Sequence, residues 1–205
     1  MVMQNTHSTS KNSNVADLNG NANTDLNQSP NSKPSKNATK TPQNSVARWL
    51  RQLLYIPFLH NRWLTQAVKD SLSDAIMQAE RGHRGEIYLI IENQLPLATA
   101  YAQDCHERAL HLFATHRVWD TQDNTGILVY VNLCEHQLQI VADRGIDQIY
   151  DNWQPLCDQA LSQFRQGQIQ TGLNELIAKL GELLLSHYPA DDVSGNELPN
   201  QVKHL

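Results

Sequence analysis

The sequence predicts a small layered α/β domain in which helices cover a mixed sheet. Two apolar runs, Glu86–Glu92 and Gly126–Asn132, are typical of buried strands. A third strand, Gln137–Asp143, follows after the short connection Leu133–His136. The first two strands are joined through a helix, so they should be parallel with a right-handed crossover. The hairpin makes the third strand antiparallel to the second, which gives a parallel pair plus one hairpin strand.

Helical periodicity fills the remaining segments. Arg62–Arg81 places its apolar residues on one stripe, and Gly82 is a natural stop. Leu97–Thr115 shows the same spacing between the first two strands. Trp153–Phe164 and Ile169–His187 follow the hairpin as two further helices. Every strand is thereby supplied with helices that can cover the sheet.

Composition divides the chain into a domain, residues 62–189, and flanking segments. Residues 1–45 are rich in Asn, Ser and Thr and contain no aromatic residue, so we predict a disordered tail. Residues 190–205 are polar again, which predicts a flexible C-terminal tail. The lead-in segment, residues 46–61, mixes arginine with large apolar residues and is predicted to be an amphipathic helix interrupted by Pro57.

Two interpretations of the lead-in segment remain open. It can dock on the domain, or it can make peripheral contact with a membrane surface. Only Arg48 and Arg51 supply positive charge before His60, which favours docking.

Charge and composition exclude several classes of protein. Residues 46–188 carry 11 Lys and Arg against 16 Asp and Glu, and this acidic balance argues against nucleic acid as a partner. No apolar run approaches the ~20 residues of a transmembrane span, and no secretory signal is present. The three cysteines show neither metal-ligand spacing nor a disulfide framework, so we expect a cytoplasmic protein with reduced thiols. There is no Gly-rich phosphate loop and no sign of an organic cofactor.

The predicted strand order brings distant polar residues to one edge of the sheet. The amino ends of the first two strands and the carboxyl end of the third should share it. The polar residues expected there are Glu86, Asp120, Thr121, Asp123, Asn124, Asp143 and Arg144. Carboxylates suit a hard cation such as Ca²⁺ or Mg²⁺, and an arginine beside them suits phosphate. The alternative is structural, with turn residues before a strand and an Asp143–Arg144 pair fixing the exit, where Gly145 supplies backbone freedom.

Several segments of this chain resemble the TPM domain family. They are VWDTQDNTGILVYV, QLQIVADRGI, NWQPLCDQALSQFRQG and GLNELIAKLGELLLSHYP, and the upstream HRGEIYLIIE is similar to the stand-alone soluble bacterial branch. The resemblance covers roughly residues 62–189. It implies a small α/β sandwich of Rossmann-like appearance, divalent cation binding, and in some members an acid phosphatase activity.

Two functional hypotheses follow. The first is a weak divalent-metal-dependent phosphomonoester hydrolase. Its metal candidates are Glu86, Asp120, Asp123 and Asp143, and its phosphate candidates are Thr121, Asn124 and Arg144. The second is a non-catalytic cytoplasmic binding or assembly module that retains the fold and acts on an unknown protein partner. The residues identify no nucleophile, which favours the second hypothesis. The charged cluster and the activity reported for some family members favour the first, and the balance leans slightly to a protein of unsettled activity with phosphatase-like ancestry.

Overall fold

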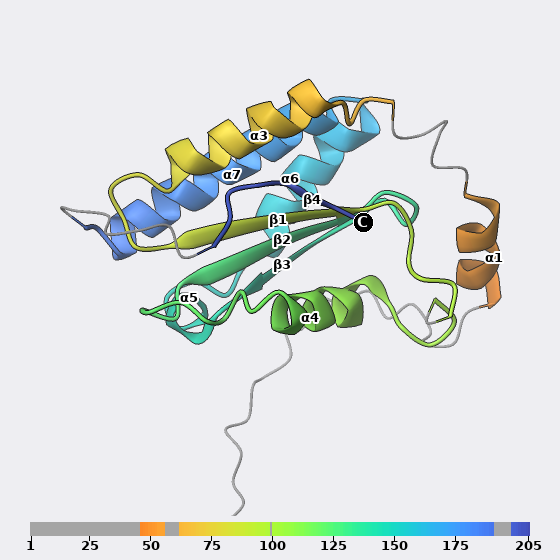
Figure 1. Cartoon of the computed structure of the whole chain (residues 1–205), viewed down its shortest axis with the longest axis horizontal. Coiled ribbons are helices and arrows are strands. Elements are labelled where there is room, and N and C mark those ends of the chain that lie inside the picture. The colour runs from red at the N-terminus through yellow and green to blue at the C-terminus, as the bar shows by residue number, and fades with distance from the viewer. Residues whose placement is uncertain (1–45, 56–61, 99, 191–197) are drawn as a thin grey trace, which may run out of the picture. The chain divides into compact units, whose positions relative to one another are not determined.

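A four-stranded mixed sheet lies at the centre of the chain (Figure 1). The computed structural model describes residues 46–55, 62–98, 100–190 and 198–205, all within the unit Ser35–Leu205. The predicted tail, residues 1–45, lies outside the described residues, as do residues 56–61 of the lead-in segment.

The order of the strands is β3-β2-β1-β4. β1 (Glu86–Glu92) and β2 (Gly126–Asn132) are parallel and pair along their whole length. β3 (Gln137–Ala142) runs antiparallel to β2. The predicted fold class, with its parallel pair and antiparallel hairpin strand, is therefore confirmed.

Helices cover both faces of the sheet, as Figure 1 shows. One face is covered by α3 (Gln66–Ala79), α6 (Gln154–Arg165) and α7 (Ile169–His187), and the other by α4 (Cys105–Thr115). All residues of β1 and β2 are buried, and successive side chains enter opposite cores. Continuous apolar runs are what a sheet covered on both sides requires.

The crossover helix is shorter than its apolar spacing predicts. α4 begins at Cys105 instead of Leu97, because Asp104 and Glu107 form a capping box before it. The Asp104 carboxylate accepts from the Glu107 amide at 2.9 Å, and the Glu107 carboxylate accepts from the Asp104 amide at 3.1 Å. These bonds satisfy amide groups that a helix leaves unpaired at its amino end.

The last residues of the chain form a strand that the sequence did not predict. β4 (Lys203–His204) pairs parallel with β1, and the Leu205 amide donates to the Ile91 carbonyl at 3.0 Å. Leu198 is buried against the same core as α4. The expectation of a free C-terminal tail is therefore wrong for residues 198–205. Their polar sequence shows no strand alternation, but the open edge of β1 offers unpaired backbone groups.

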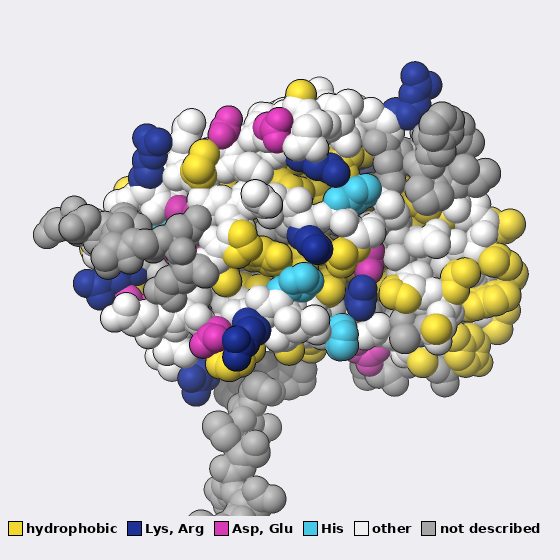
Figure 2. All heavy atoms as spheres, in the orientation of Figure 1, with side chains coloured by type: hydrophobic (Ala, Val, Ile, Leu, Met, Phe, Trp, Pro, Cys, Tyr) yellow, Lys and Arg dark blue, Asp and Glu magenta, His cyan; other side chains and the backbone are white. Residues whose placement is uncertain are grey.

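The described part of the lead-in segment is docked on the domain. α1 (Val46–Leu54) lies against the loop after β2, where Arg51 and Gln52 both bond the Glu135 carboxylate. Trp49 packs against the core on the α4 side of the sheet, whereas Val46, Leu50, Leu53 and Leu54 stay on the surface (Figure 2). Among the described helices, none is long and apolar enough to cross a membrane.

We expect Glu80→Gln to remove a pH dependence of stability. Glu80 follows α3 and accepts from the Ile87 amide at 2.8 Å, and burial, with Glu86 nearby, raises its pKa from 4.5 to about 8. Ionising a buried carboxyl destabilises the fold, so the contribution of Glu80 to stability is fully present below pH 4.5 and is lost as pH rises to about 8. Glutamine keeps the acceptor and cannot ionise.

Thermal unfolding across pH checks this. The Glu80→Gln variant should match wild type at pH 4 and melt several degrees higher at pH 9. The exposed Glu182→Gln on α7 is the control and should follow wild type throughout. A Glu80→Gln curve parallel to wild type would contradict the assignment.

Candidate functional site

The predicted edge exists, and we call it the charged rim: Arg84, Asp123, Asn124, Asp143 and Arg144. Two backbone hydrogen bonds bring its segments together. The Asp143 amide donates to the Gly126 carbonyl at 2.9 Å, and the Gly145 amide donates to the Asn124 carbonyl at 3.0 Å. The loop before β2 and the exit from β3 thus lie side by side, as the strand order required.

Arg144 belongs to α5 (Arg144–Asp147), a single helical turn that the sequence did not predict. Its guanidinium donates to the side-chain oxygen of Asn124 at 3.1 Å. Asn124 has a φ of 56°, a left-handed conformation that asparagine tolerates better than most residues. The local turn therefore aims the Asn124 side chain at Arg144 instead of leaving an Asp143–Arg144 ion pair at the exit.

Arg84 is the rim residue that sequence reasoning missed. It precedes β1, and its guanidinium lies 3.4 Å from the Asp123 carboxylate. The Arg84 carbonyl accepts from the Thr125 hydroxyl at 2.8 Å, which fixes the backbone beside the β2 loop. The parallel pairing of β1 with β2 could have indicated Arg84, because pairing Glu86 with Gly126 places residue 84 next to the loop before β2.

Asp143 is buried at the centre of the rim. One oxygen of its carboxylate accepts from the Arg144 amide at 2.7 Å and caps α5. The other oxygen is buried and has no hydrogen-bond partner among the described residues. An ionised oxygen in that position is a strong acceptor for a cation or a donor.

Gly145 is required because a side chain would not fit there, and not because its backbone adopts a conformation that only glycine tolerates. A Cβ at this position would lie 2.6 Å from the Asn124 carbonyl oxygen and 3.0 Å from that of Asp123. The Tyr188 hydroxyl donates to the Gly145 carbonyl at 2.7 Å and holds the turn from the end of α7. The close approach of the two loops depends on the missing side chain.

The other predicted ligands, Asp120, Thr121 and Glu86, interact with neighbouring protein groups. Asp120 is exposed and lies 3.7 Å from Arg117. Thr121 is buried and accepts from the Thr125 amide at 2.9 Å. The Glu86 carboxylate accepts from the Leu198 amide at 3.4 Å, so the C-terminal segment uses part of it.

The rim offers few ligands to a divalent cation. Over the described ranges, no three His, Cys, Asp or Glu side chains are grouped to hold a metal. The buried free oxygen of Asp143 suits a cation, and Ca²⁺ can complete its shell with backbone carbonyls and water. Binding of Ca²⁺ or Mg²⁺ therefore stays a prediction centred on Asp143.

A second polar group occupies the opposite end of the sheet, where sequence analysis assigned no function. Glu92 is buried at the end of β1, and Arg108 of α4 donates to both of its oxygens at 2.6–3.2 Å. The Tyr130 hydroxyl donates to Glu92 at 2.6 Å and accepts from the Asn132 amide group at 2.9 Å. This network joins β1, β2 and α4.

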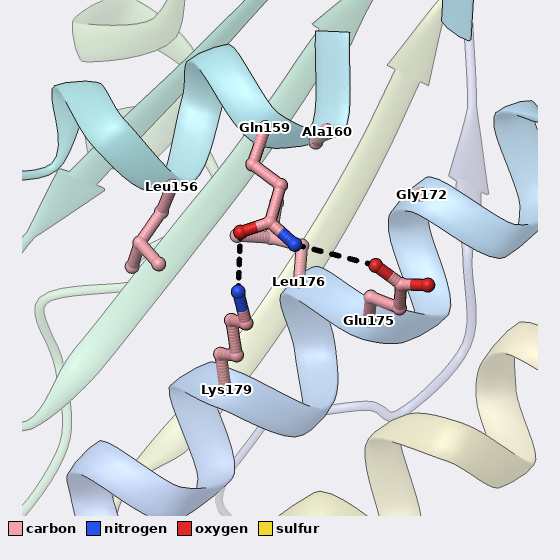
Figure 3. Close-up of a pocket in the computed structure, with 7 residues that line it drawn as sticks. All are labelled: Leu156, Gln159, Ala160, Gly172, Glu175, Leu176 and Lys179. Carbon is pink, nitrogen blue, oxygen red and sulfur yellow. Dashed lines mark hydrogen bonds between the residues drawn. The ribbon is translucent and has the colours of Figure 1, made fainter. Parts of the chain in front are cut away.

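Two hollows in the described structure lie between helices, away from the charged rim. A cavity of about 10 Å³ lies between α6 and α7. Figure 3 shows its lining, where Gln159 bonds both Glu175 and Lys179. The cavity has room for about one water molecule. An open hollow of about 320 Å³ lies between α3 and α7, lined by small residues such as Ala75 and Gly181 and by larger polar ones such as Arg81 and Glu182.

Comparisons with known proteins agree with the fold. The family model of the TPM domain matches residues 60–183. The solution structure of the BA42 protein from the psychrophilic bacterium Bizionia argentinensis is 28% identical. That match covers 69% of this chain and 94% of that one, with a TM-score of 0.61.

The N-terminal domain of a protein from P. gingivalis is 14% identical over 62% of this chain and 82% of that one. Its TM-score of 0.51 supports the fold alone. The comparison with curated proteins found no match.

Proposed function

The chain belongs to the TPM domain family, and we propose that it is a binding module whose charged rim holds a phosphate group of its ligand. One observation carries the proposal. Two exposed arginines, Arg84 and Arg144, are held by the consecutive residues Asp123 and Asn124.

Each guanidinium has donors left for a ligand. A guanidinium carries five N–H donors, and one from each arginine goes to the rim. The bonds to Asp123 and Asn124 restrict both side chains, so a ligand meets donors that are already ordered. Guanidinium groups match the geometry of phosphate oxygens, and hydrogen bonds to charged groups stabilise by about 1.5–3 kcal/mol.

The state of the three cysteines argues against hydrolysis by a cysteine nucleophile and so favours the binding module. Burial raises the pKa of Cys105 and Cys157, and raises that of Cys134 to about 11. All three are buried and protonated at neutral pH. None is available as a thiolate to attack phosphorus.

The free oxygen of Asp143 favours a second candidate, a metal-dependent phosphomonoester hydrolase. Asp143 would hold the cation, and Arg144 would orient the phosphate beside it. A bound divalent cation supplies positive charge that stabilises the phosphoryl group and lowers the pKa of bound water. The two candidates share the phosphate-binding residues and differ in whether the ligand is cleaved.

We expect Arg144→Gln to weaken phosphate binding about tenfold, which is the loss of one charge-assisted hydrogen bond. The amide resonances of residues 84, 124 and 144 should shift when inorganic phosphate is titrated into the wild type. The control is Arg165→Gln, an exposed arginine at the end of α6, which should bind as the wild type does. Equal affinity of all three proteins, or no shift at the rim, would reject the site.

Hydrolysis of p-nitrophenyl phosphate separates the two candidates. The assay is run with Ca²⁺, with Mg²⁺ and with chelator, on wild type and on Asp143→Asn. Turnover that needs metal and disappears in Asp143→Asn would replace the binding module with the hydrolase. Phosphate binding without turnover in any arm supports the binding module.

A further inference from the structure

α1 turns its aliphatic side chains to solvent, while Arg48, Gln52 and the half-buried Trp49 face the domain. Val46, Leu50, Leu53 and Leu54 recur at helical spacing and are 59%, 44%, 49% and 74% exposed. Arg48 and Gln52 lie on the other face and are buried. Figure 2 shows hydrophobic side chains gathered where Figure 1 places α1. An amphipathic helix that docks only for stability would be expected to face the other way.

Hydrogen bonds hold the helix in this orientation. The Arg48 guanidinium donates to the Gln103 carbonyl at 3.0 Å. The Gln52 side chain accepts from the Leu95 amide at 2.8 Å and donates to Glu135. Turning the leucines inward would break these bonds and leave buried polar groups unpaired. The hydrogen bonds that dock α1 therefore also keep its leucines exposed.

The sequence around α1 is basic and contains no acidic residue. Between Asp25 and Asp70 there is no Asp or Glu, while the rest of the chain is acidic. The cations within this interval are Lys33, Lys36, Lys40, Arg48, Arg51, Arg62 and Lys69. Arg51 and Gln52 of α1 both bond Glu135, whose charge Arg51 offsets. The exposed apolar face therefore belongs to a stretch of the sequence that carries a net positive charge.

We propose that the outer face of α1 seats the protein on an anionic membrane surface, with the helix lying in the plane of the lipid headgroups. Leucines enter the acyl boundary, and the net positive charge of this stretch of the sequence favours acidic lipids. A second copy of the chain fits less well, because stable interfaces bury about 800 Å² per partner and four aliphatic side chains on one helix present much less. α1 lies at the end of the sheet opposite to the charged rim, so this proposal is independent of phosphate binding there.

Sedimentation of the full chain with vesicles tests the proposal. Wild type should bind phosphatidylglycerol/phosphatidylcholine vesicles, bind pure phosphatidylcholine vesicles less, and lose affinity for the anionic ones as salt rises. Leu50→Glu/Leu53→Glu should lower the partition coefficient on anionic vesicles at least tenfold, because both burial energies are lost and like charge is added. Neither side chain takes part in docking α1, so the domain stays folded, and a melting curve verifies this.

The matched control is Met77→Glu/Leu185→Glu. These apolar residues on α3 and α7 are 45% and 49% exposed, as Leu50 and Leu53 nearly are, and the added charge is the same. The control should bind as wild type does. The proposal is overturned if wild type does not sediment with anionic vesicles, or if both double variants bind equally. It is also overturned if wild type is a dimer that Leu50→Glu/Leu53→Glu converts to a monomer without any vesicle binding by wild type.

Discussion

Gly126→Ala should lower the melting temperature by about 6 °C or more, from a loss of roughly 3 kcal/mol or greater in a domain of this size. Gly126 begins β2, and a Cβ there would lie 1.9 Å from the Val118 carbonyl oxygen. That oxygen belongs to the backbone, and Val118 is completely buried, so no side-chain rotation relieves the overlap. The loop after α4 would have to move away from the sheet.

The same displacement reaches the charged rim, because the loop that moves carries Asp123 and Asn124. Phosphate titration of Gly126→Ala should therefore show weaker shifts at residue 144, even where the protein remains folded. Gly167→Ala provides the control. Gly167 has a φ of 77° and open space around it, so alanine adds only backbone strain of about 1 kcal/mol. Similar melting temperatures for the two variants would show that the overlap at Gly126 is relieved at little cost.

The central strands were predictable because a strand buried on both faces needs an almost continuous run of apolar residues, which the sequence shows. β1 and β2 were predicted with the bounds that the structure shows, since both faces of these strands are buried and every position is constrained. β4 was missed for the opposite reason. It is two residues long, and its pairing with β1 depends on backbone groups and not on a side-chain pattern.

The sequence predicted where the charged rim lies on the sheet, but it did not predict which side chains contact one another there. Strand order alone brought Asn124 and Arg144 to one edge. It did not predict that the Arg144 guanidinium bonds Asn124, because that contact depends on the left-handed turn at Asn124. Arg84 was missed because a basic residue beside a glycine is common in solvated turns. Side-chain partners follow from loop geometry, which periodicity does not encode.

The buried network at the other end of the sheet carries the second large effect. We expect Arg108→Met to cost about 3–5 kcal/mol, which lowers the melting temperature by roughly 6–20 °C. Arg108 donates three hydrogen bonds to Glu92, whose side chain is 3% exposed. Methionine fills a similar volume but leaves the carboxylate buried with the Tyr130 hydroxyl and no cation.

The double variant Glu92→Gln/Arg108→Met distinguishes loss of the charge partner from loss of packing. Glutamine removes the charge and keeps an oxygen that can accept from Tyr130. If the penalty is an uncompensated buried charge, the double variant should recover at least half of the stability that Arg108→Met loses, because removing both charges of a buried pair is often nearly neutral. A double variant no more stable than Arg108→Met would instead assign the loss to packing between α4 and the sheet. Chemical denaturation of the four proteins of this cycle gives the coupling energy directly. A large value would mean that the ion pair, and not apolar contact alone, fixes α4 on β1 and β2.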